Sequence, residues 1–274
     1  NANILILEKG SLPQGASTTN ASFACFGSIS EIIDDLKNHT EEEVIQLIQK
    51  RYTGLQLLRK NLGDEALDFK LLGGYELFLK DDDAFYEQCL QKIPFINEVI
   101  KPLFKTDVFS KEVDRFNFGN IFEYLIFNPF EAQIDTGNMM QALLKKAHQN
   151  DILILNNQTV TDYQETTENV EVVTNGITFK TNKLLFTTNG FASKITNNQV
   201  QPARAQVLIT KPIPNLDIKG TFHLDQGYYY FRNINDRILF GGGRNLDFEG
   251  ETTTSHDTTK LIQNRLQALL KTVI

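Results

Sequence analysis

Glu8 is the first residue whose position suggests chemistry, because it ends the apolar run 3–7, NILIL. Such a run is typical of a strand that is buried on both faces of a parallel sheet. A carboxylate at the end of this kind of strand binds ribose hydroxyls in dinucleotide-binding sheets. Isolated acids at strand ends are also common on protein surfaces. Glu8 alone therefore leaves two interpretations open, a ribose ligand and a surface acid.

Small and hydroxyl-bearing residues follow, at 15–18 (GAST) and 20–22 (NAS). Small side chains let backbone amides approach a pyrophosphate, and hydroxyl groups add hydrogen-bond donors. A flexible surface loop would have the same composition. However, the apolar segment 23–27, FACFG, comes directly afterwards and should be buried. This order favours a loop that wraps a ligand and leads into the interior.

Tyr228, Tyr230 and Arg232 form a second candidate group, for substrate binding. They alternate along one apparent strand, whose period of two places them on one face. Phenolic hydroxyls and a guanidinium on that face could bind a carboxylate, although tyrosines are also ordinary strand residues. Arg204 and Arg237 are weaker candidates for anion binding. Arg237 lies at a hairpin turn, where a solvated charge is the favoured interpretation.

The composition excludes several classes of function. The chain has 274 residues, of which 41% are hydrophobic and 22% charged, which suits a globular protein of one large or two modest domains. A net charge of -7 argues against nucleic acid as a partner, since phosphate binding needs a basic face. No signal peptide and no apolar run of membrane length is visible, so we expect no membrane span.

The cysteines and histidines predict neither disulfides nor a metal site. Cys25 and Cys89 are far apart and form no CxxC pair, which argues against a disulfide framework or structural zinc. Few cysteines are typical of a reducing, cytoplasmic location. The four histidines have no ligand spacing, so no metal is predicted. The oligomeric state stays open.

The pattern of elements predicts a mixed α/β chain. A strand-like segment at 122–135, a helix and a second buried strand at 151–157 have the order of a parallel α/β unit. Thr40 and Glu43 have capping-box spacing at the start of a helix over 40–60. Strands are predicted at 73–79 and 183–190, and a helix at 81–104 that is bent or interrupted at Pro94. A hairpin at 170–181 is predicted to turn at Asn175-Gly176. A β-rich region at 200–243 and a C-terminal helix complete the prediction.

Several segments together resemble one known family. They are ILEKG (6–10), GAST (15–18), NASFACFG (20–27), the run IDTGNMMQALLKKAHQNDILILNNQTVTDYQ (134–164), KLLFTTNG (183–190), QPARAQVLIT (201–210) and GYYYFRNINDRILFGGG (227–243). In order and spacing these segments resemble the flavin-dependent D-amino-acid oxidase superfamily, which includes glycine oxidase and sarcosine oxidase. No single motif is decisive. The resemblance implies FAD as the cofactor and a small, amino-acid-like substrate.

The resemblance also implies roles for residues that would hold the adenosine half of FAD. Glu8 would bind the adenosine ribose, with Lys9 beside it. Ala16 and Ser17 would lie in the pyrophosphate region. Val160 would present its backbone N–H and C=O to the adenine edge.

Other residues would lie near the flavin and the substrate. Ala21, Ser22 and Phe23 would line the flavin ring through backbone contacts. The resemblance sets Asn189 and Gly190 near the pyrophosphate, and Tyr228 at the position of a substrate-pocket tyrosine.

The sequence departs from the family pattern in several places. Ser22 and Ala205 stand where glycine is usual, and each is tolerated only if its φ stays negative. We expect the first strand with its Gly-x-Gly-x-x-Gly turn to precede Asn1. The arginine that clamps the substrate carboxylate, and a final glycine-rich loop, would follow Ile274. The resemblance thus implies that this sequence is a family member truncated at both ends.

The resulting fold prediction is α/β, and α+β overall. A discontinuous, incomplete FAD-binding Rossmann-like domain would comprise 1–62, 131–198 and 255–274. An antiparallel-sheet substrate domain would comprise 63–130 and 199–254.

The implied function is FAD-dependent oxidation of the C–N bond of a D-amino acid or an N-substituted glycine. One alternative is that a protein of the same fold oxidises a 2-hydroxy acid or a glycerol phosphate. Another is a non-catalytic fragment or binding module. Neither the substrate nor the choice between oxidase and dehydrogenase follows from the sequence.

Overall fold

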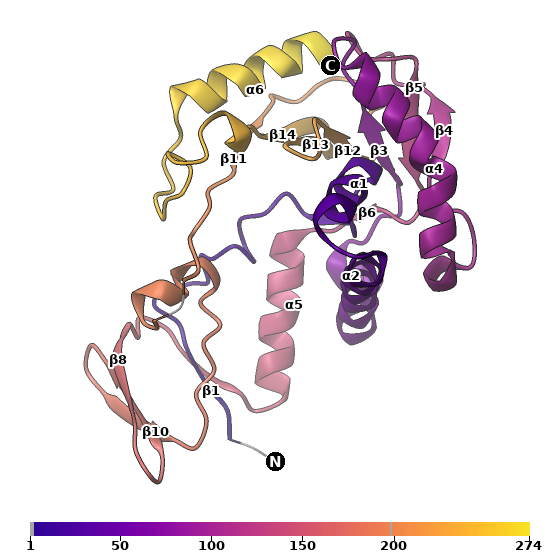
Figure 1. Ribbon diagram of the computed structural model, residues 1–274. Helices are drawn as coiled ribbons and strands as arrows, with labels where there is room; N and C mark the ends of the chain where they lie inside the picture. The colour runs from indigo at the N-terminus through magenta and orange to yellow at the C-terminus, as the bar shows by residue number, and fades with distance from the viewer. Residues whose placement is uncertain (1–2, 198) are drawn as a thin grey trace. The chain divides into compact units, whose positions relative to one another are not determined.

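The computed structural model describes residues 3–197 and 199–274, which form two compact units (Figure 1). Unit 1 comprises Asn1–Asn20, Thr136–Arg204 and Thr252–His256; unit 2 comprises Ala21–Asp135, Ala205–Glu251 and Asp257–Ile274. The predicted mixed α/β class is confirmed. The two units group the chain by contacts. Of the segments that we assigned to the FAD-binding domain, 21–62, 131–135 and 257–274 fall in unit 2. Our division into a cofactor domain and a substrate domain is a functional one and stays a prediction.

Unit 1 contains a parallel strand pair, but not the predicted one. The segment 122–135 does not pair with 151–157, because it forms β5 (Tyr124–Asn128) and β6 (Ala132–Gln133), which pair antiparallel within unit 2. β1 (Leu5–Leu7) pairs in parallel with β7 (Leu153–Leu155), and α5 (Thr136–Gln149) directly precedes β7 in the chain. The prediction that both strands are buried was wrong, since Ile6 is 42% and Leu153 57% exposed. Among the described strands β1 and β7 pair only with each other, so their remaining surfaces stay partly open.

In the rest of unit 1, the predicted hairpin at 170–181 is confirmed, whereas the predicted strand at 183–190 is not. β8 (Val160–Glu165), β9 (Val170–Thr174) and β10 (Thr178–Thr181) form an antiparallel sheet that turns at Asn175-Gly176. The predicted strand at 183–190 is absent: residues 183–188 are irregular, and η1 (Asn189–Lys194) follows. A strand needs a hydrogen-bonding neighbour, and none of the described strands pairs with this segment.

Unit 2 is built on a seven-stranded sheet in the order β11-β14-β13-β12-β3-β5-β4. All neighbours are antiparallel except β12 and β3. The strands are β3 (Gly74–Leu77), β4 (Ser110–Val113), β5 (Tyr124–Asn128), β11 (Gln206–Ile209), β12 (Thr221–Leu224), β13 (Tyr229–Ile234) and β14 (Arg237–Gly242). A separate short pair joins β2 (Phe23–Ala24) to β6 (Ala132–Gln133).

One face of this sheet is apolar and packs against α6 (Lys260–Val273), which lies next to β11 and β14 (Figure 1). Phe231 stacks between Phe222 and Phe240, with ring centroids 4.5 and 5.3 Å away. Ile262 and Leu266 of α6 are fully buried in this core. The site must therefore lie elsewhere, because this face of the sheet is filled.

The second core of unit 2 forms among α1 (Ile29–Asn38), α2 (Glu41–Leu62) and α4 (Asp83–Phe104). The capping box predicted for Thr40 and Glu43 is confirmed, and Ser28 and Glu31 form another one on α1. α4 runs uninterrupted through Pro94. The short α3 (Asp64–Leu67) and η2 (Arg244–Leu246) complete the elements.

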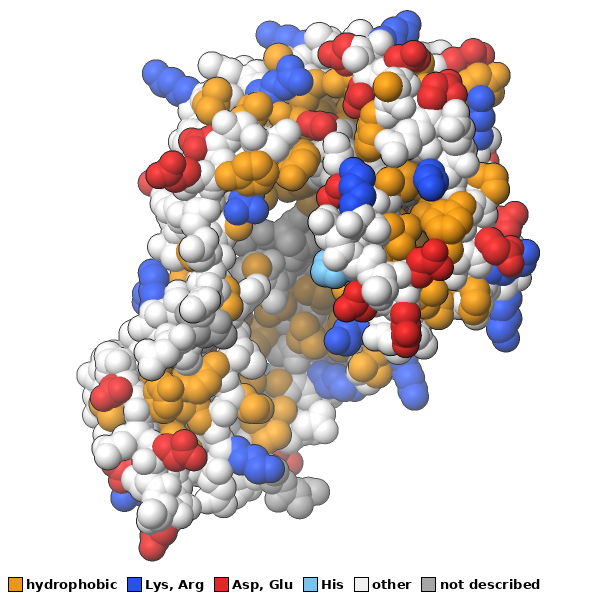
Figure 2. Space-filling model, in the orientation of Figure 1, with side chains coloured by type: hydrophobic (Ala, Val, Ile, Leu, Met, Phe, Trp, Pro, Cys, Tyr) orange, Lys and Arg blue, Asp and Glu red, His pale blue; other side chains and the backbone are white. Residues whose placement is uncertain are grey.

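On the face shown in Figure 2, acidic and basic side chains are interspersed. Within 3–197 and 199–274, none of the helices combines the length and apolar character that crossing a membrane requires.

Candidate functional site

The candidate site is a cavity of about 310 Å³ within unit 2. The segment around β2, the first turn of α1, the middle of α2 and the β12–β13 hairpin form it. Its lining residues are Ala21, Phe23, Cys25, Phe26, Gly27, Glu31, Arg51, His223, Gly227 and Tyr230. This volume lies at the small end of ligand pockets, so the cavity suits a molecule of amino-acid size.

The wall of the cavity is set by strand register. His223 on β12 pairs directly with Tyr230 on β13, and with Glu76 on β3. These three side chains therefore share one face of the sheet, opposite the face covered by α6. Phe23 lies against both rings, at 5.4 Å from His223 and 5.7 Å from Tyr230. The cavity thus has an aromatic wall that carries two polar groups.

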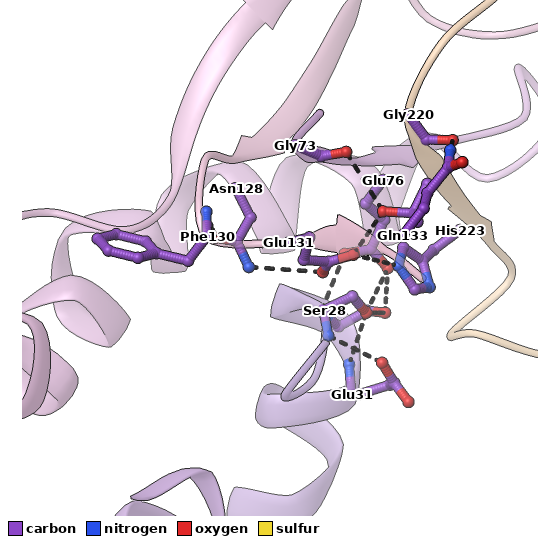
Figure 3. Close-up of polar contacts among 12 residues, drawn as sticks. Ser28, Glu31, Gly73, Glu76, Asn128, Phe130, Glu131, Gln133, Gly220 and His223 are labelled. Carbon is purple, nitrogen blue, oxygen red and sulfur yellow. Dashed lines mark hydrogen bonds and ion pairs between the residues drawn. The ribbon is translucent and has the colours of Figure 1, made fainter. Parts of the chain in front are cut away.

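A buried polar cluster lies behind this wall (Figure 3). The Glu131 carboxylate accepts a hydrogen bond from Thr221 Oγ1 at 2.8 Å, and its Oε2 lies 2.9 Å from His223 Nε2. The Glu76 carboxylate accepts hydrogen bonds from the hydroxyls of Ser28 and Ser30. Both acids are at most 3% exposed. The cluster supports the cavity wall with two carboxylates, two serines and an imidazole.

Burial and charge shift the pKa values of these groups. Burial is the largest influence on His223 and opposes its charge, but the charge and hydrogen bond of Glu131, together with Glu31 and Glu76, outweigh it and raise the pKa of the imidazole to about 9. Burial raises the pKa of Glu76 to about 7, against the hydrogen bonds from Ser30. Burial, reinforced by Glu131 and Glu31, raises the pKa of the Cys25 thiol well above its usual value. At neutral pH the cavity therefore holds an imidazolium beside a neutral thiol.

The predicted substrate residues have three different environments. Tyr230 lines the cavity, and burial raises the pKa of its hydroxyl, which stays protonated. Arg232 is 7% exposed; its Nη1 donates to Gln133 Oε1 at 3.1 Å, and it is not part of the cavity wall. Tyr228 precedes β13, is 38% exposed and packs against Phe248. The cavity wall thus includes one of the three predicted substrate residues.

Unit 1 holds most of the residues predicted to bind FAD. Glu8 follows β1, and its Oε1 accepts a hydrogen bond from the Gly10 N–H at 2.8 Å. The Gln158 N–H donates to the Glu8 carbonyl at 3.0 Å, which brings Glu8 close to Val160 at the start of β8. Lys9 is exposed. The positions predicted for the ribose and the adenine therefore lie close together in the structure.

The remaining predicted cofactor residues lie on loops and on η1. Ala16 and Ser17 belong to an exposed turn, where their carbonyls accept from Asn20 Nδ2. Asn189 and Gly190 begin η1. The structure does not gather these four residues through any hydrogen bond that it records.

The segment predicted to line the flavin lies in unit 2. Ala21 and Phe23 both line the cavity. Ser22 is buried with a φ of +62°, so the condition of a negative φ is not met at this position. Ala205, the other residue at a usual glycine position, has no positive φ.

Sequence reasoning missed the polar residues His223, Glu131, Glu76, Glu31 and Arg51 of the site. They come from separate segments, so no spacing links them. One local signal exists, the pair Gly73-Gly74: a Cβ on Gly74 would overlap the Glu131 carboxylate. The absence of a side chain at Gly74 leaves room for the buried Glu131 carboxylate. The sequence alone does not show which residue lies next to Gly74.

The family described as FAD dependent oxidoreductase, DAO, has a model that matches residues 1–273. No curated protein matches the chain.

Solved structures share the fold at low identity. Glycine oxidase from Geobacillus kaustophilus is 13% identical with a TM-score of 0.72, over 99% of this chain and 71% of that one. Iminodiacetate oxidase from a Chelativorans species is 16% identical with a TM-score of 0.72, over 98% and 78%. L-proline dehydrogenase from P. horikoshii is 16% identical with a TM-score of 0.67, over 99% and 70%.

Proposed function

The chain belongs to the family of FAD-dependent oxidoreductases, and from that premise we propose that it oxidises the C–N bond of a D-amino acid or an N-substituted glycine. The names of its structural neighbours, among them glycine oxidase and iminodiacetate oxidase, support an amino-acid-like substrate. The two free cysteines fit the cytoplasmic location that we expect.

The donor set of unit 1 fits the adenosine half of FAD. Glu8 offers a carboxylate just beyond a strand, and the neighbouring β8 begins at Val160. The exposed loop that carries Ala16 and Ser17 has short side chains, and an added Cβ at Gly15 would meet open space. We assign Glu8 and Lys9 to the ribose, this loop with Asn189 and Gly190 to the pyrophosphate, and Val160 to the adenine. Ala21, Ser22 and Phe23 are assigned to the flavin ring.

The observation that carries the proposed reaction is the cavity in unit 2. Its volume of about 310 Å³ admits a small amine that bears a carboxylate. When bound, FAD supplies the hydride acceptor. The residues of the chain orient the substrate and exclude water: Phe23 supplies an apolar surface, and Tyr230 a protonated hydroxyl that donates to the substrate. No acid–base residue is required when the amine enters neutral.

An anaerobic titration tests the reaction. We expect the absorbance of bound FAD to bleach with N-methylglycine or D-alanine, and to stay unchanged with lactate or glycerol 3-phosphate. Bleaching by lactate or glycerol 3-phosphate alone would favour the alternative substrates. Purified protein that holds no flavin after FAD is added would indicate a non-catalytic binding module.

Substitution of Tyr230 tests its role. We expect Tyr230→Phe to raise KM for N-methylglycine about tenfold, the effect of losing roughly one good hydrogen bond to a charged group. Tyr163→Phe on β8 is the matched control and should leave KM unchanged. The roles of Tyr228 and Arg232 remain predictions, which Tyr228→Phe and Arg232→Gln test in the same assay.

A further inference from the structure

His223 is a buried titratable residue of the cavity wall that the proposed reaction does not use. It lies on β12 between Tyr230 on one neighbouring strand and Glu76 on the other. Its side chain is almost fully buried, yet it forms part of the cavity lining. A charged ring in this position costs desolvation energy unless a partner stabilises it. Such an arrangement calls for a function or for a compensating charge.

Glu131 supplies the compensating charge and fixes the ring. Its Oε2 lies 2.9 Å from His223 Nε2 and also accepts from Thr221 Oγ1. Asn128 Nδ2 approaches the other carboxylate oxygen at 3.4 Å. The absence of a side chain at Gly74 leaves room for this carboxylate. With Nε2 engaged, Nδ1 is the ring nitrogen left for a ligand, since no hydrogen bond occupies it within the described part of the chain.

The charges around the cavity select one kind of ligand. The imidazole pKa of about 9 keeps His223 cationic at neutral pH. Arg51 adds a second cation to the lining. Three acids face this region as well: Glu31 in the lining, and Glu76 and Glu131 behind it. The lining itself holds two cations, His223 and Arg51, and one carboxylate, Glu31, so a single ligand carboxylate matches its excess of one positive charge. The carboxyl groups behind the lining disfavour a dianion such as phosphate.

We propose that His223 binds the carboxylate of the ligand through Nδ1–H, and that Glu131 is the positioning residue that orients and charges the imidazole. The identification of this ligand as the substrate rests on the proposed function. Binding of a carboxylate to the cavity does not depend on it.

The test uses the full chain with FAD added, and acetate as the probe. In protein labelled with ¹⁵N-histidine, we expect acetate to shift the Nδ1 signal of His223 and to leave the signal of His148 in place. His223→Gln should weaken acetate binding at least tenfold in calorimetry, whereas the control His148→Gln should not. An unchanged Nδ1 signal, or equal acetate affinity in His223→Gln, overturns the proposal. If His223→Gln does not fold, the response of the His223 Nδ1 signal to acetate in the wild-type protein decides whether the proposal holds.

The role of Glu131 has a separate signature in pH. In Glu131→Gln the imidazole loses the charge that raises its pKa. Because burial lowers this pKa and Glu131 opposes it, we expect the affinity for acetate to fall at least tenfold below that of the wild type at pH 8. The loss should become smaller toward pH 5.5, where more of the imidazole is protonated. Equal losses at both pH values would indicate a merely structural role and contradict the assignment. The facing groups Glu31, Glu76, Arg51, Tyr230 and Cys25 are the same in both proteins, so the difference reports on Glu131.

The outcomes also separate this inference from the proposed reaction. If acetate binds at His223 but no amine bleaches the flavin, the proposed function fails and the inference stands. If N-methylglycine bleaches the flavin with the same KM in His223→Gln, the proposed function stands and the inference fails.

Discussion

Ser22 has the backbone conformation of a glycine while carrying a side chain. Its φ of +62° lies in the left-handed region, which costs an L-residue roughly 1–2 kcal/mol. Ser22→Gly and Ser22→Ala both remove the hydroxyl, so the difference between them isolates the backbone cost. We expect the glycine variant to be more stable than the alanine variant by about 1 kcal/mol. Thermal unfolding of the two variants measures this difference; a more stable alanine variant would contradict it.

Glu76 makes stability depend on pH in a defined window. Its pKa is about 7 in the folded protein and near 4.5 when unfolded, so the folded state retains the proton longer. The stability from this difference is fully present below pH 4.5 and is lost as pH rises through 7. The loss is on the order of 3 kcal/mol for a shift of this size.

The neutral isostere provides the reference for Glu76. We expect the unfolding temperature of the wild type to fall relative to that of Glu76→Gln between pH 4.5 and 7.5. Ser28, Ser30, Glu31 and His223 surround the group in both proteins, so the difference isolates this carboxyl. A constant difference across the range would show that Glu76 is ionised in the folded state throughout.

At the scale of elements, α6 stabilises unit 2 by covering the apolar face of the sheet. Leu266 on this helix is fully buried against the aromatic strands, whereas Leu261 is 53% exposed. We expect Leu266→Ala to destabilise the protein by about 2–5 kcal/mol, and Leu261→Ala to change its stability by less than about 0.5 kcal/mol. Denaturant unfolding of the two variants tests this. Equal effects would mean that α6 does not seal this core.

The elements that could be predicted from the sequence are those fixed by local interactions. The helix after Thr40 begins where a capping box can form, and the hairpin at Asn175-Gly176 turns where its residues favour a turn. The predicted strand at 183–190 was wrong because an apolar run becomes a strand only beside a partner. Pro94 did not interrupt α4, whose buried face is held by the surrounding core.

At the scale of the whole molecule, the site depends on contacts that no local pattern contains. His223 and Glu131 are separated by 92 residues yet form a buried pair. The period of two correctly placed Tyr230 and Arg232 on one face of a strand, but their neighbours decide that only Tyr230 reaches the cavity. The order of motifs identified the family and the cofactor. It could not identify the polar residues of the cavity, because these meet only after the sheet of unit 2 has formed.

FAD binding should also act on the whole molecule, through its stability. A ligand present at 100 times its Kd stabilises the folded state by about 2.7 kcal/mol. At this chain length we expect a rise of roughly 5 to 10 °C in the unfolding temperature. Glu8→Ala should reduce this rise by removing the proposed ribose ligand.

The matched control for Glu8 is Glu168→Ala, which removes an exposed acid from the same unit and the same charge from the protein. In the protein without FAD, Glu8→Ala should change stability little, because among the described residues the carboxylate bonds only to the Gly10 N–H two residues away. The rise with FAD should therefore shrink in Glu8→Ala and persist in Glu168→Ala. An equal rise in both variants would show that Glu8, at the end of β1, does not bind the ribose. It would also contradict the assignment of unit 1 to the adenosine half of FAD.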